Sequence, residues 1–461
     1  MKGYISAYRP RRLKIGDFTL SNKNQPNCLC TNLMCLLCFV QNIILDLNFT
    51  SFYFMTITTS SYSVSKGRLL SAAFLISGTC VGGGMLALPV ETFQIGFFPS
   101  LLAMALTWIF MTVSGLLLVE ANLWMPEGAH MMTIASRLLG KIGKWLCVTL
   151  YLFMAYASLI AYNSGGAVIL IRGIKTFFSS SMTYRSGCVL FGLLFGTLAY
   201  LGTKRIGRVN ILLMTGMILS YIGLVGFGFK EVSIHRLIQQ QWSSLGMVFP
   251  LLLATFSYQM IIPTLTPYLR RDPKSLRFAV LLGTTIPFCA YAIWQWVVLG
   301  SVPLEGSNGL QEAFSKGQAA TEALYAIVSN TYFVALAESF AFFALVTSYL
   351  GIALGLFDFL RDGLKLQQQI SHKLCIGALV VLPVIFFATA FPNAFVLALE
   401  VSGGFGDALF SGIIPVLMVW VGRYSKNFIG NYRVAGGKGL LAAMFFCSSY
   451  VLVIQWVKLM R

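Results

Sequence analysis

Long apolar runs without any charged residue recur along most of the chain. Clear examples span residues 69–90, 97–119, 145–171 and 242–269. A helix needs about 20 mostly apolar residues to cross a bilayer, whereas an outer-membrane strand needs about 10 residues of alternating polarity. These runs are long and do not alternate, so the pattern predicts an all-α integral membrane protein.

The pattern predicts eleven transmembrane helices after an N-terminal extension. We divide the chain into an extension, residues 1–65, and a membrane domain, residues 66–461. The extension is polar and basic at first and then carries a cysteine-rich patch whose spacing differs from that of common zinc sites, so we predict no metal there. Met55 is a possible alternative start. The predicted helices have these approximate bounds: 69–92, 97–121, 145–171, 186–203, 209–229, 244–268, 278–301, 331–358, 374–391, 394–421 and 440–458.

Composition and charge agree with a membrane protein. Hydrophobic residues make up 57% of the chain and charged residues 10%, against about 25% charged in soluble proteins. The net charge of +18 lies in short loops, so it indicates membrane topology and no nucleic-acid partner. With the N-terminus inside, 17 Lys and Arg fall in inner loops and 8 in outer ones. This bias predicts a cytoplasmic N-terminus and a periplasmic C-terminus.

The first predicted helix contains an unusual glycine cluster. Residues 78–89 read GTCVGGGMLALP, in the middle of a charge-free run. Small residues can serve helix packing alone, but three consecutive glycines favour an unwound backbone, which is tolerated in a membrane only against protein or a polar cavity. The exposed N–H groups of such a break suit a carboxylate. The predicted substrate contacts here are Thr79, Cys80, Gly82, Gly83 and Gly84.

The sixth predicted helix carries a second interruption. Its centre reads TFSYQ at residues 255–259, and Pro263 and Pro267 follow. A simple proline kink is one interpretation. The other is an inverted-repeat transporter, in which breaks occupy corresponding positions of two halves, here about 69–229 and 244–421, with 440–458 as an extra helix. The predicted substrate contacts are Phe256, Ser257, Tyr258 and Gln259.

Aromatic residues of the third predicted helix could line a pocket for a ring. Tyr156 lies near the middle of the run and is the better candidate, whereas Tyr151 and Tyr162 are more simply explained by packing.

Carboxyl groups are the candidate proton carriers. Glu338, Glu400 and Asp407 fall within predicted helices, where an ionised carboxylate is costly and usually faces a cavity or a partner. Glu338 and Asp407 are the deepest, and we place Glu338 first. A structural hydrogen bond is the alternative role for each. Glu120, at the end of its helix, is most simply solvated. The histidines, which all lie outside the predicted helices, are His130, His235 and His372.

Four stretches of the chain resemble one family of transporters. Residues 78–89, 287–295, 347–358 and 415–420 are similar to the hydroxy and aromatic amino acid permeases, which belong to the amino acid–polyamine–organocation superfamily. The resemblance runs from about residue 66 to the C-terminus, and it is closest to the tyrosine-specific permeases of Gram-negative bacteria.

The resemblance implies a leucine-transporter-like fold with five-plus-five inverted repeats and broken helices 1 and 6. It also implies proton-coupled uptake of an aromatic amino acid across the bacterial inner membrane, with the first-helix glycines at the substrate carboxylate and the helix-6 break at the ring. Where the family commonly has Phe-Gly-Phe-His, this chain has Phe256-Ser257-Tyr258-Gln259. A possible proton carrier is therefore missing, while Gln259 can still form hydrogen bonds.

Tyrosine import by proton symport is the leading hypothesis, with no cofactor and no catalytic residues. Sodium coupling remains open, because Thr347 and Ser348 offer hydroxyl oxygens. Tryptophan or phenylalanine remain open as substrates, and so does the oligomeric state. A membrane-embedded enzyme is a distant alternative, since no nucleophile with a base and no metal cluster is visible in the predicted bundle.

Overall fold

A computed structural model describes residues 64–127, 129–178, 182–200, 203–228, 232–306, 309–327, 331–363, 370–392 and 394–460. This part of the chain is helical, and its only β-type pairing is an isolated bridge between Gly96 and Gln240. The expectations for the cysteine-rich patch and for a start at Met55 lie outside the described residues. An all-helical membrane protein is therefore confirmed for the described part.

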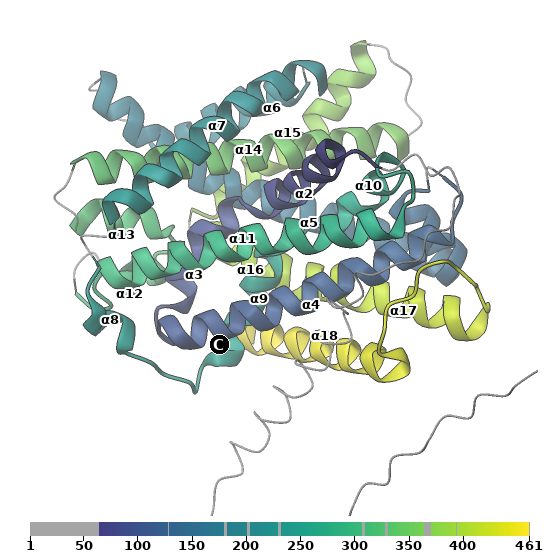
Figure 1. Ribbon diagram of the computed structural model, residues 1–461. Helices are drawn as coiled ribbons and strands as arrows, with labels where there is room; N and C mark the ends of the chain where they lie inside the picture. Colours follow the sequence, from purple (N-terminus) through teal and green to yellow (C-terminus); the bar gives the residue numbers. More distant parts are fainter. Residues whose placement is uncertain are drawn as a thin grey trace, which may run out of the picture. The chain divides into compact units, whose positions relative to one another are not determined.

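Eight single helices in the described part are long and apolar enough to cross a membrane, and a ninth span is a bent pair. The pair consists of α2 (Lys66–Cys80) and α3 (Gly83–Thr92), which meet at 52° and appear as two separate coils in Figure 1. Two shorter apolar helices are α6 (Tyr184–Tyr200) and α7 (Thr203–Gly228). Each of the eleven predicted segments thus contains helix.

The other spans follow the predicted runs closely. They are α4 (Phe97–Leu123), α5 (Met131–Phe178), α9 (Phe249–Thr255) with α10 (Ile262–Tyr268), α11 (Pro273–Ser301), α14 (Thr331–Gly363), α15 (Ile370–Ala390), α16 (Ala394–Val401) with the π-helix η3 (Ser402–Ile413) and α17 (Ile414–Trp420), and α18 (Gly437–Met460). Short helices in the connections are α8 (Ile234–Ile238), η1 (Leu245–Val248), η2 (Gln259–Ile261), α12 (Leu310–Ser315), α13 (Ala320–Ile327) and η4 (Val421–Ser425).

Local sequence signals explain where several spans begin. Asp272 accepts a hydrogen bond from the Ser275 amide at 2.9 Å, and Pro273 occupies the first helical position of α11, where its missing N–H costs nothing. In α5 the chain changes direction at Gly140, whose φ of 76° lies in the left-handed region that glycine adopts readily. The segment before Gly140 is therefore set apart from the long apolar span that follows.

Successive spans cross in alternate directions, which defines two ends of the bundle. We call them the Lys66 end, where α2 begins, and the Thr92 end, where α3 finishes. Among the described helices, α14 packs against α5 and α7, α11 against α2 and α4, and η3 against α9 and α18. α3 and α9 contact each other, so the two interrupted spans lie together inside the bundle.

Two short helices cover α3 at the Thr92 end. α12 and α13 both pack on α3, and Arg172 of α5 forms ion pairs with Glu322 of α13 and with Glu338 of α14, the latter at 2.9 Å. Burial raises the pKa of the Glu322 carboxyl, and the Arg172 guanidinium opposes this rise. Arg172 thereby joins the covering segment to two spanning helices.

A buried ion pair joins two helices at the Lys66 end. The Arg423 guanidinium donates to both carboxylate oxygens of Glu120 at 2.7 and 2.6 Å, and both side chains are at most 3% exposed. The Val434 amide donates to Glu120 at 2.7 Å, and Arg423 donates to the Val434 carbonyl at 2.8 Å. The expectation that Glu120 is solvated is therefore wrong, because Arg423 and Val434 satisfy its charge inside the protein.

The contact between η3 and α9 leaves no room for a side chain at Gly403. A Cβ there would lie 1.9 Å from the Pro250 carbonyl oxygen, which is rigid backbone. We expect Gly403→Ala to lower the free energy of unfolding by about 1–3 kcal/mol through overpacking. Thermal unfolding of the detergent-solubilised protein measures the change. Gly351→Ala is the matched control, because a Cβ at Gly351 meets nothing within 4 Å; equal melting temperatures for the two variants would contradict the prediction.

Candidate functional site

The predicted break in the first span is present. α2 ends at Cys80, α3 begins at Gly83, and Val81 and Gly82 between them have extended backbone angles. Gly82 caps α3 without any side-chain hydrogen bond. Because the first N–H groups of a helix have no acceptor within it, the N-terminus of α3 leaves amide donors at the break.

The glycines at this break are closely surrounded by side chains of other helices. A Cβ at Gly82 would lie 2.2 Å from the Ser348 hydroxyl of α14, and one at Gly83 would lie 2.4 Å from the Tyr162 ring of α5. A Cβ at Gly84 would lie 3.2 Å from the Cα of Thr255, at the end of α9. The break in the first span therefore meets α5, α14 and the break in the sixth span at one place.

The sixth span is interrupted at residues 256–258, between α9 and η2. Side chains replace the lost backbone bonds: the Tyr291 hydroxyl donates to the Thr255 carbonyl at 3.0 Å, and the Tyr258 amide donates to Gln259 Oε1 at 3.0 Å. The Phe256 ring packs edge-on against Tyr291 with 5.0 Å between ring centroids. The simple proline kink is thus not the whole explanation, since the break lies before both prolines.

Tyr258 and Gln259 hold this break against α4. The Tyr258 hydroxyl donates to the Met111 carbonyl at 3.0 Å. Gln259 Nε2 donates to the same carbonyl at 3.3 Å and to the Ser114 hydroxyl at 3.4 Å. Both side chains are buried. Their polar atoms are therefore engaged in fixing the interrupted backbone to its neighbour.

Asp407 lies at the other side of the sixth-span break. Its carboxylate accepts hydrogen bonds from Ser257 at 2.5 Å and from Ser411 at 2.7 Å, and the residue is 1% exposed. It is also within electrostatic range of the Cys80 thiol and the Tyr162 hydroxyl. A π-helix widens the turn and is often found at functional sites, which fits the position of Asp407 within η3. A buried carboxyl is thus bonded to the sixth-span break through Ser257.

The polar groups of three other predicted site residues bond to partners outside the two breaks. The Tyr156 hydroxyl donates to the Leu379 carbonyl of α15 at 2.9 Å. The Thr79 hydroxyl bonds back to Ile76 of its own helix at 2.7 Å. Glu338 is paired with Arg172 near the Thr92 end.

Tyr162, which sequence reasoning assigned to packing, contacts the glycine cluster instead. Its ring lies against Gly83, next to Gly84, which faces Thr255 at the sixth-span break. One signal could have found it: Tyr162 is followed by Asn163, Ser164 and two glycines, an unusually polar and small group in the middle of an apolar span. Such a group indicates a close approach to protein rather than to lipid.

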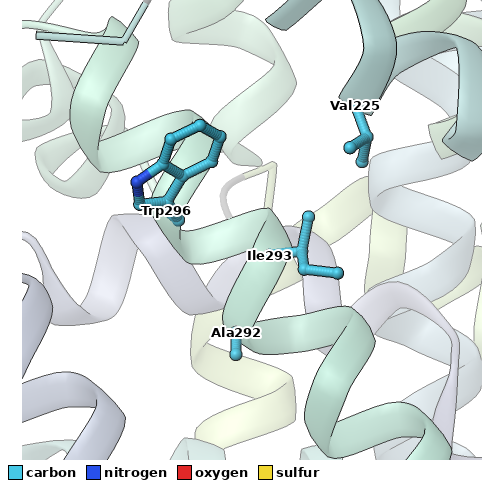
Figure 2. A pocket seen from close by; sticks show the side chains of 4 residues that line it. All are labelled: Val225, Ala292, Ile293 and Trp296. Carbon is cyan, nitrogen blue, oxygen red and sulfur yellow. The ribbon is translucent and has the colours of Figure 1, made fainter. Parts of the chain in front are cut away.

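An apolar groove lies on the flank of the bundle, away from these residues. It has a volume of about 410 Å³ and is lined by Val225 of α7 and by Ala292, Ile293 and Trp296 of α11. Figure 2 shows Val225 facing this group from a separate helix. Ile293 is 40% exposed. The lining offers no charged group for an amino acid, which suits lipid chains rather than the substrate.

The chain is similar over most of its length to known amino acid permeases. A family model described as the tryptophan/tyrosine permease family matches residues 65–455. The chain is 29% identical to a tryptophan-specific transport protein of Haemophilus influenzae, over 84% of this chain and 95% of that protein. It is 28% identical to tyrosine-specific transport system 1 of the same organism, with 80% and 92% covered. A tryptophan-specific transport protein of Pseudomonas aeruginosa is 30% identical, with 81% and 90% covered.

The fold also resembles a solved structure. The crystal structure of MhsT in complex with L-phenylalanine superimposes with a TM-score of 0.60, covering 87% of this chain and 99% of that one. The sequences are 14% identical. This likeness concerns the arrangement of helices.

A branched side chain at Gly83 should close the site. We expect Gly83→Val to abolish uptake, because the new Cβ would collide with the Tyr162 ring and with Leu345, 2.9 Å away. Uptake of labelled aromatic amino acid by cells, normalised to the amount of protein in the membrane, measures the loss. Gly226→Val is the control, since a Cβ at Gly226 meets nothing within 4 Å. Normal substrate affinity in a correctly inserted Gly83→Val protein would contradict the role of this break.

Proposed function

Because the chain belongs to the tryptophan/tyrosine permease family, we propose that it is a secondary active transporter that imports tyrosine together with a proton. The family makes it a multi-pass membrane permease for aromatic amino acids and not an enzyme. The choice of tyrosine and of the proton is our proposal. The observation that carries it is the meeting of two helix breaks, at Gly84 and Thr255, inside the bundle.

The N-terminus of α3 is the proposed site for the substrate carboxylate. Its first amides point into the break, and the helix dipole places partial positive charge there. Gly82, Gly83 and Gly84 have no side chains, so a carboxylate can reach the backbone. Cys80 and Tyr162 border this place. The geometry supports Tyr162 over Tyr156 as the aromatic residue of α5 at the substrate.

The second break is the proposed site for the aromatic ring. Phe256 offers an apolar face, and Ser257 offers a hydroxyl that is already bonded to Asp407. Tyr258 and Gln259 act by holding the break against α4. Aromatic amino acids suit such a place, because their rings take up large apolar area while the polar backbone groups of the break bind their charged ends.

The proposed architecture has eleven spans in two inverted repeats, about 69–229 and 244–421, followed by an extra helix. The packing supports it: the contact of α14 with α7 has its counterpart in that of α5 with η3, and the contact of α11 with α2 in that of α4 with α9. We place the chain in the bacterial inner membrane with the Lys66 end in the cytoplasm. Residues 1–65 are proposed to lie outside the transport body, and the family match begins at residue 65.

Asp407 is the proposed coupling group. It is buried, it touches the sixth-span break through Ser257, and the hydrogen bonds that the structure shows to it come from hydroxyls rather than from a cation. Such a carboxyl can take up and release a proton as the site changes exposure. Glu338, the first choice from sequence, is instead held in an ion pair with Arg172.

Two alternatives are each supported by one observation. Tryptophan is the alternative substrate, since two of the relatives described above are named as tryptophan-specific. Sodium is the alternative coupling ion, because the Ser348 hydroxyl lies against Gly82, beside the unwound backbone. Hydroxyl and carbonyl oxygens are ligands that hard cations prefer.

Uptake of labelled tyrosine into cells tests substrate and energy source together. We expect unlabelled tyrosine to compete better than tryptophan or phenylalanine, and a proton uncoupler to abolish accumulation at constant sodium. The physical reason is that uphill import must use a gradient, and the uncoupler removes only the proton gradient. Stronger competition by tryptophan would reassign the substrate. Accumulation that survives the uncoupler but needs external sodium would reassign the coupling ion.

Two matched carboxyl-to-amide changes separate the coupling candidates. We expect Asp407→Asn to block accumulation of substrate against its gradient while exchange of pre-loaded substrate continues, because the amide cannot carry a proton. Glu338→Gln should accumulate substrate, since its partner Arg172 also pairs with Glu322. Counterflow and net uptake in proteoliposomes distinguish the two activities. The opposite result, with Glu338→Gln uncoupled and Asp407→Asn coupled, would refute this assignment.

A further inference from the structure

Three charged side chains meet near the Thr92 end, outside the site described above. Lys458 of α18 donates to Glu400 of α16 at 2.6 Å, to Glu91 of α3, and to the Met247 carbonyl of η1 at 3.2 Å. The Glu91 and Glu400 side chains are 3% and 9% exposed, and that of Lys458 is 17% exposed. This Lys458 cluster joins α3, the second half of the broken first span, to α16 in the last span of the second repeat and to the extra helix α18.

The charges of the Lys458 cluster do not balance. Two carboxylates share one ammonium group, so the fully ionised cluster carries one negative charge in a buried place. Glu91 Oε2 is buried, and no described residue forms a hydrogen bond with it. Glu91 also stands one residue before the end of α3, where the helix dipole disfavours negative charge. An incompletely paired buried carboxylate costs several kcal/mol, so one bound proton would make the cluster neutral.

A shared proton fits the geometry of the two carboxyl groups. Glu91 Oε1 and Glu400 Oε1 both accept from the Lys458 ammonium group, so the two carboxyl groups lie side by side; a hydrogen bond between them would need a proton, because two ionised carboxylates cannot form one. A proton on one of them supplies the donor for that bond, and Lys458 neutralises the other. Two carboxylates placed side by side repel each other when both are ionised, so such a pair favours the binding of one proton.

The described surroundings offer no other charge that would balance the cluster. The packed elements α9, η1 and α17 carry no titratable side chain. Lys175, near the end of α5 beyond Arg172, is exposed to solvent; the other charged groups on the elements packed against α3, α16 and α18 have partners of their own or lie at the Lys66 end. Those nearest the Thr92 end, with their partners, are Glu312 with Lys316, Glu322 and Glu338 with Arg172, and Asp407 with Ser257 and Ser411.

We propose that the Lys458 cluster is a second proton-binding site, whose loading stabilises the packing of α3 against α16 at the Thr92 end. The proton comes from the solution at that end, forms an O–H bond on Glu91 or Glu400, and returns to the same solution when α3 moves away and water reaches the carboxylates. Because this proton does not cross the membrane, it changes the rates at which the Thr92 end opens and closes but not the driving force for substrate uptake. The idea rests on the transport function proposed above and adds a pH-sensitive gate to it.

Infrared spectroscopy of the purified protein tests proton binding directly. We expect a carboxylic acid C=O band that appears as the pH is lowered and is lost in Glu91→Gln and Glu400→Gln. Lys458→Met should shift the appearance of this band to higher pH, because removing the cation favours the neutral carboxyls. A cluster that binds no proton would give no carboxylic acid band in the wild-type protein and therefore no shift of that band in Lys458→Met. Glu305→Gln is the matched control, since Glu305 is exposed on the connection after α11.

Exchange of aromatic amino acid by proteoliposomes at equal pH on both sides tests the gate. We expect the exchange rate of the wild-type protein to change with pH. Glu91→Gln should exchange at the wild-type low-pH rate at every pH, and it should still accumulate substrate against its gradient. A band and a pH profile that are unchanged in both Glu91→Gln and Glu400→Gln would overturn the proposal. If the wild-type protein exchanges no aromatic amino acid, the proposed function fails, while the infrared result still decides whether the cluster binds a proton.

Discussion

Every polar backbone group that leaves a helix inside a membrane needs another partner, and this requirement shapes the centre of the protein. Two spans are interrupted, and the helices around them supply what the interruptions lack. Tyr291 donates to the carbonyl at the end of α9, while Gln259 accepts the Tyr258 amide. Gln259 and Tyr258 in turn bond to α4. The breaks are thus built parts of the fold, fixed by specific side-chain hydrogen bonds, and the N-terminus of α3 at the first break is the place proposed for the substrate carboxylate.

The buried charged groups have three different sets of partners. These sets separate the ion pair with a structural role from the carboxyl groups that are proposed to bind a proton. Glu120 and Arg423 form a balanced pair with two further backbone bonds, and removing one partner of such a pair costs about 3–5 kcal/mol. Glu91 and Glu400 share a single ammonium group. Asp407 is bound by two hydroxyls. The pairing with cations thus becomes less complete from the first case to the last, and the two less completely paired cases are the ones for which we propose proton binding.

The positions of these groups fit a transporter that works by moving one half of a broken span. The Glu120–Arg423 pair lies at the Lys66 end, where it joins α4 to η4, the short helix that follows α17. At the Thr92 end, α3 is covered by α12 and α13 and bound by Lys458, and Arg172 shares its charge between Glu322 and Glu338. A movement of α3 at this end therefore has to break its contacts with Lys458 and with α12 and α13.

The sequence alone determined the membrane class, the eleven helical segments and the two interruptions, because length, hydropathy and clustered glycines or prolines act locally. It also singled out Asp407, Cys80 and the glycines of the first break as candidate site residues, which stay predictions. It could not determine which side chains face the breaks, since that depends on helix rotation and packing. Tyr162 lies at Gly83 whereas Tyr156 bonds to α15, and Gln259 faces α4. The partners of Glu120, Glu338 and Glu400 lie between 58 and 303 residues away along the chain, so only the tertiary structure could bring these charges together.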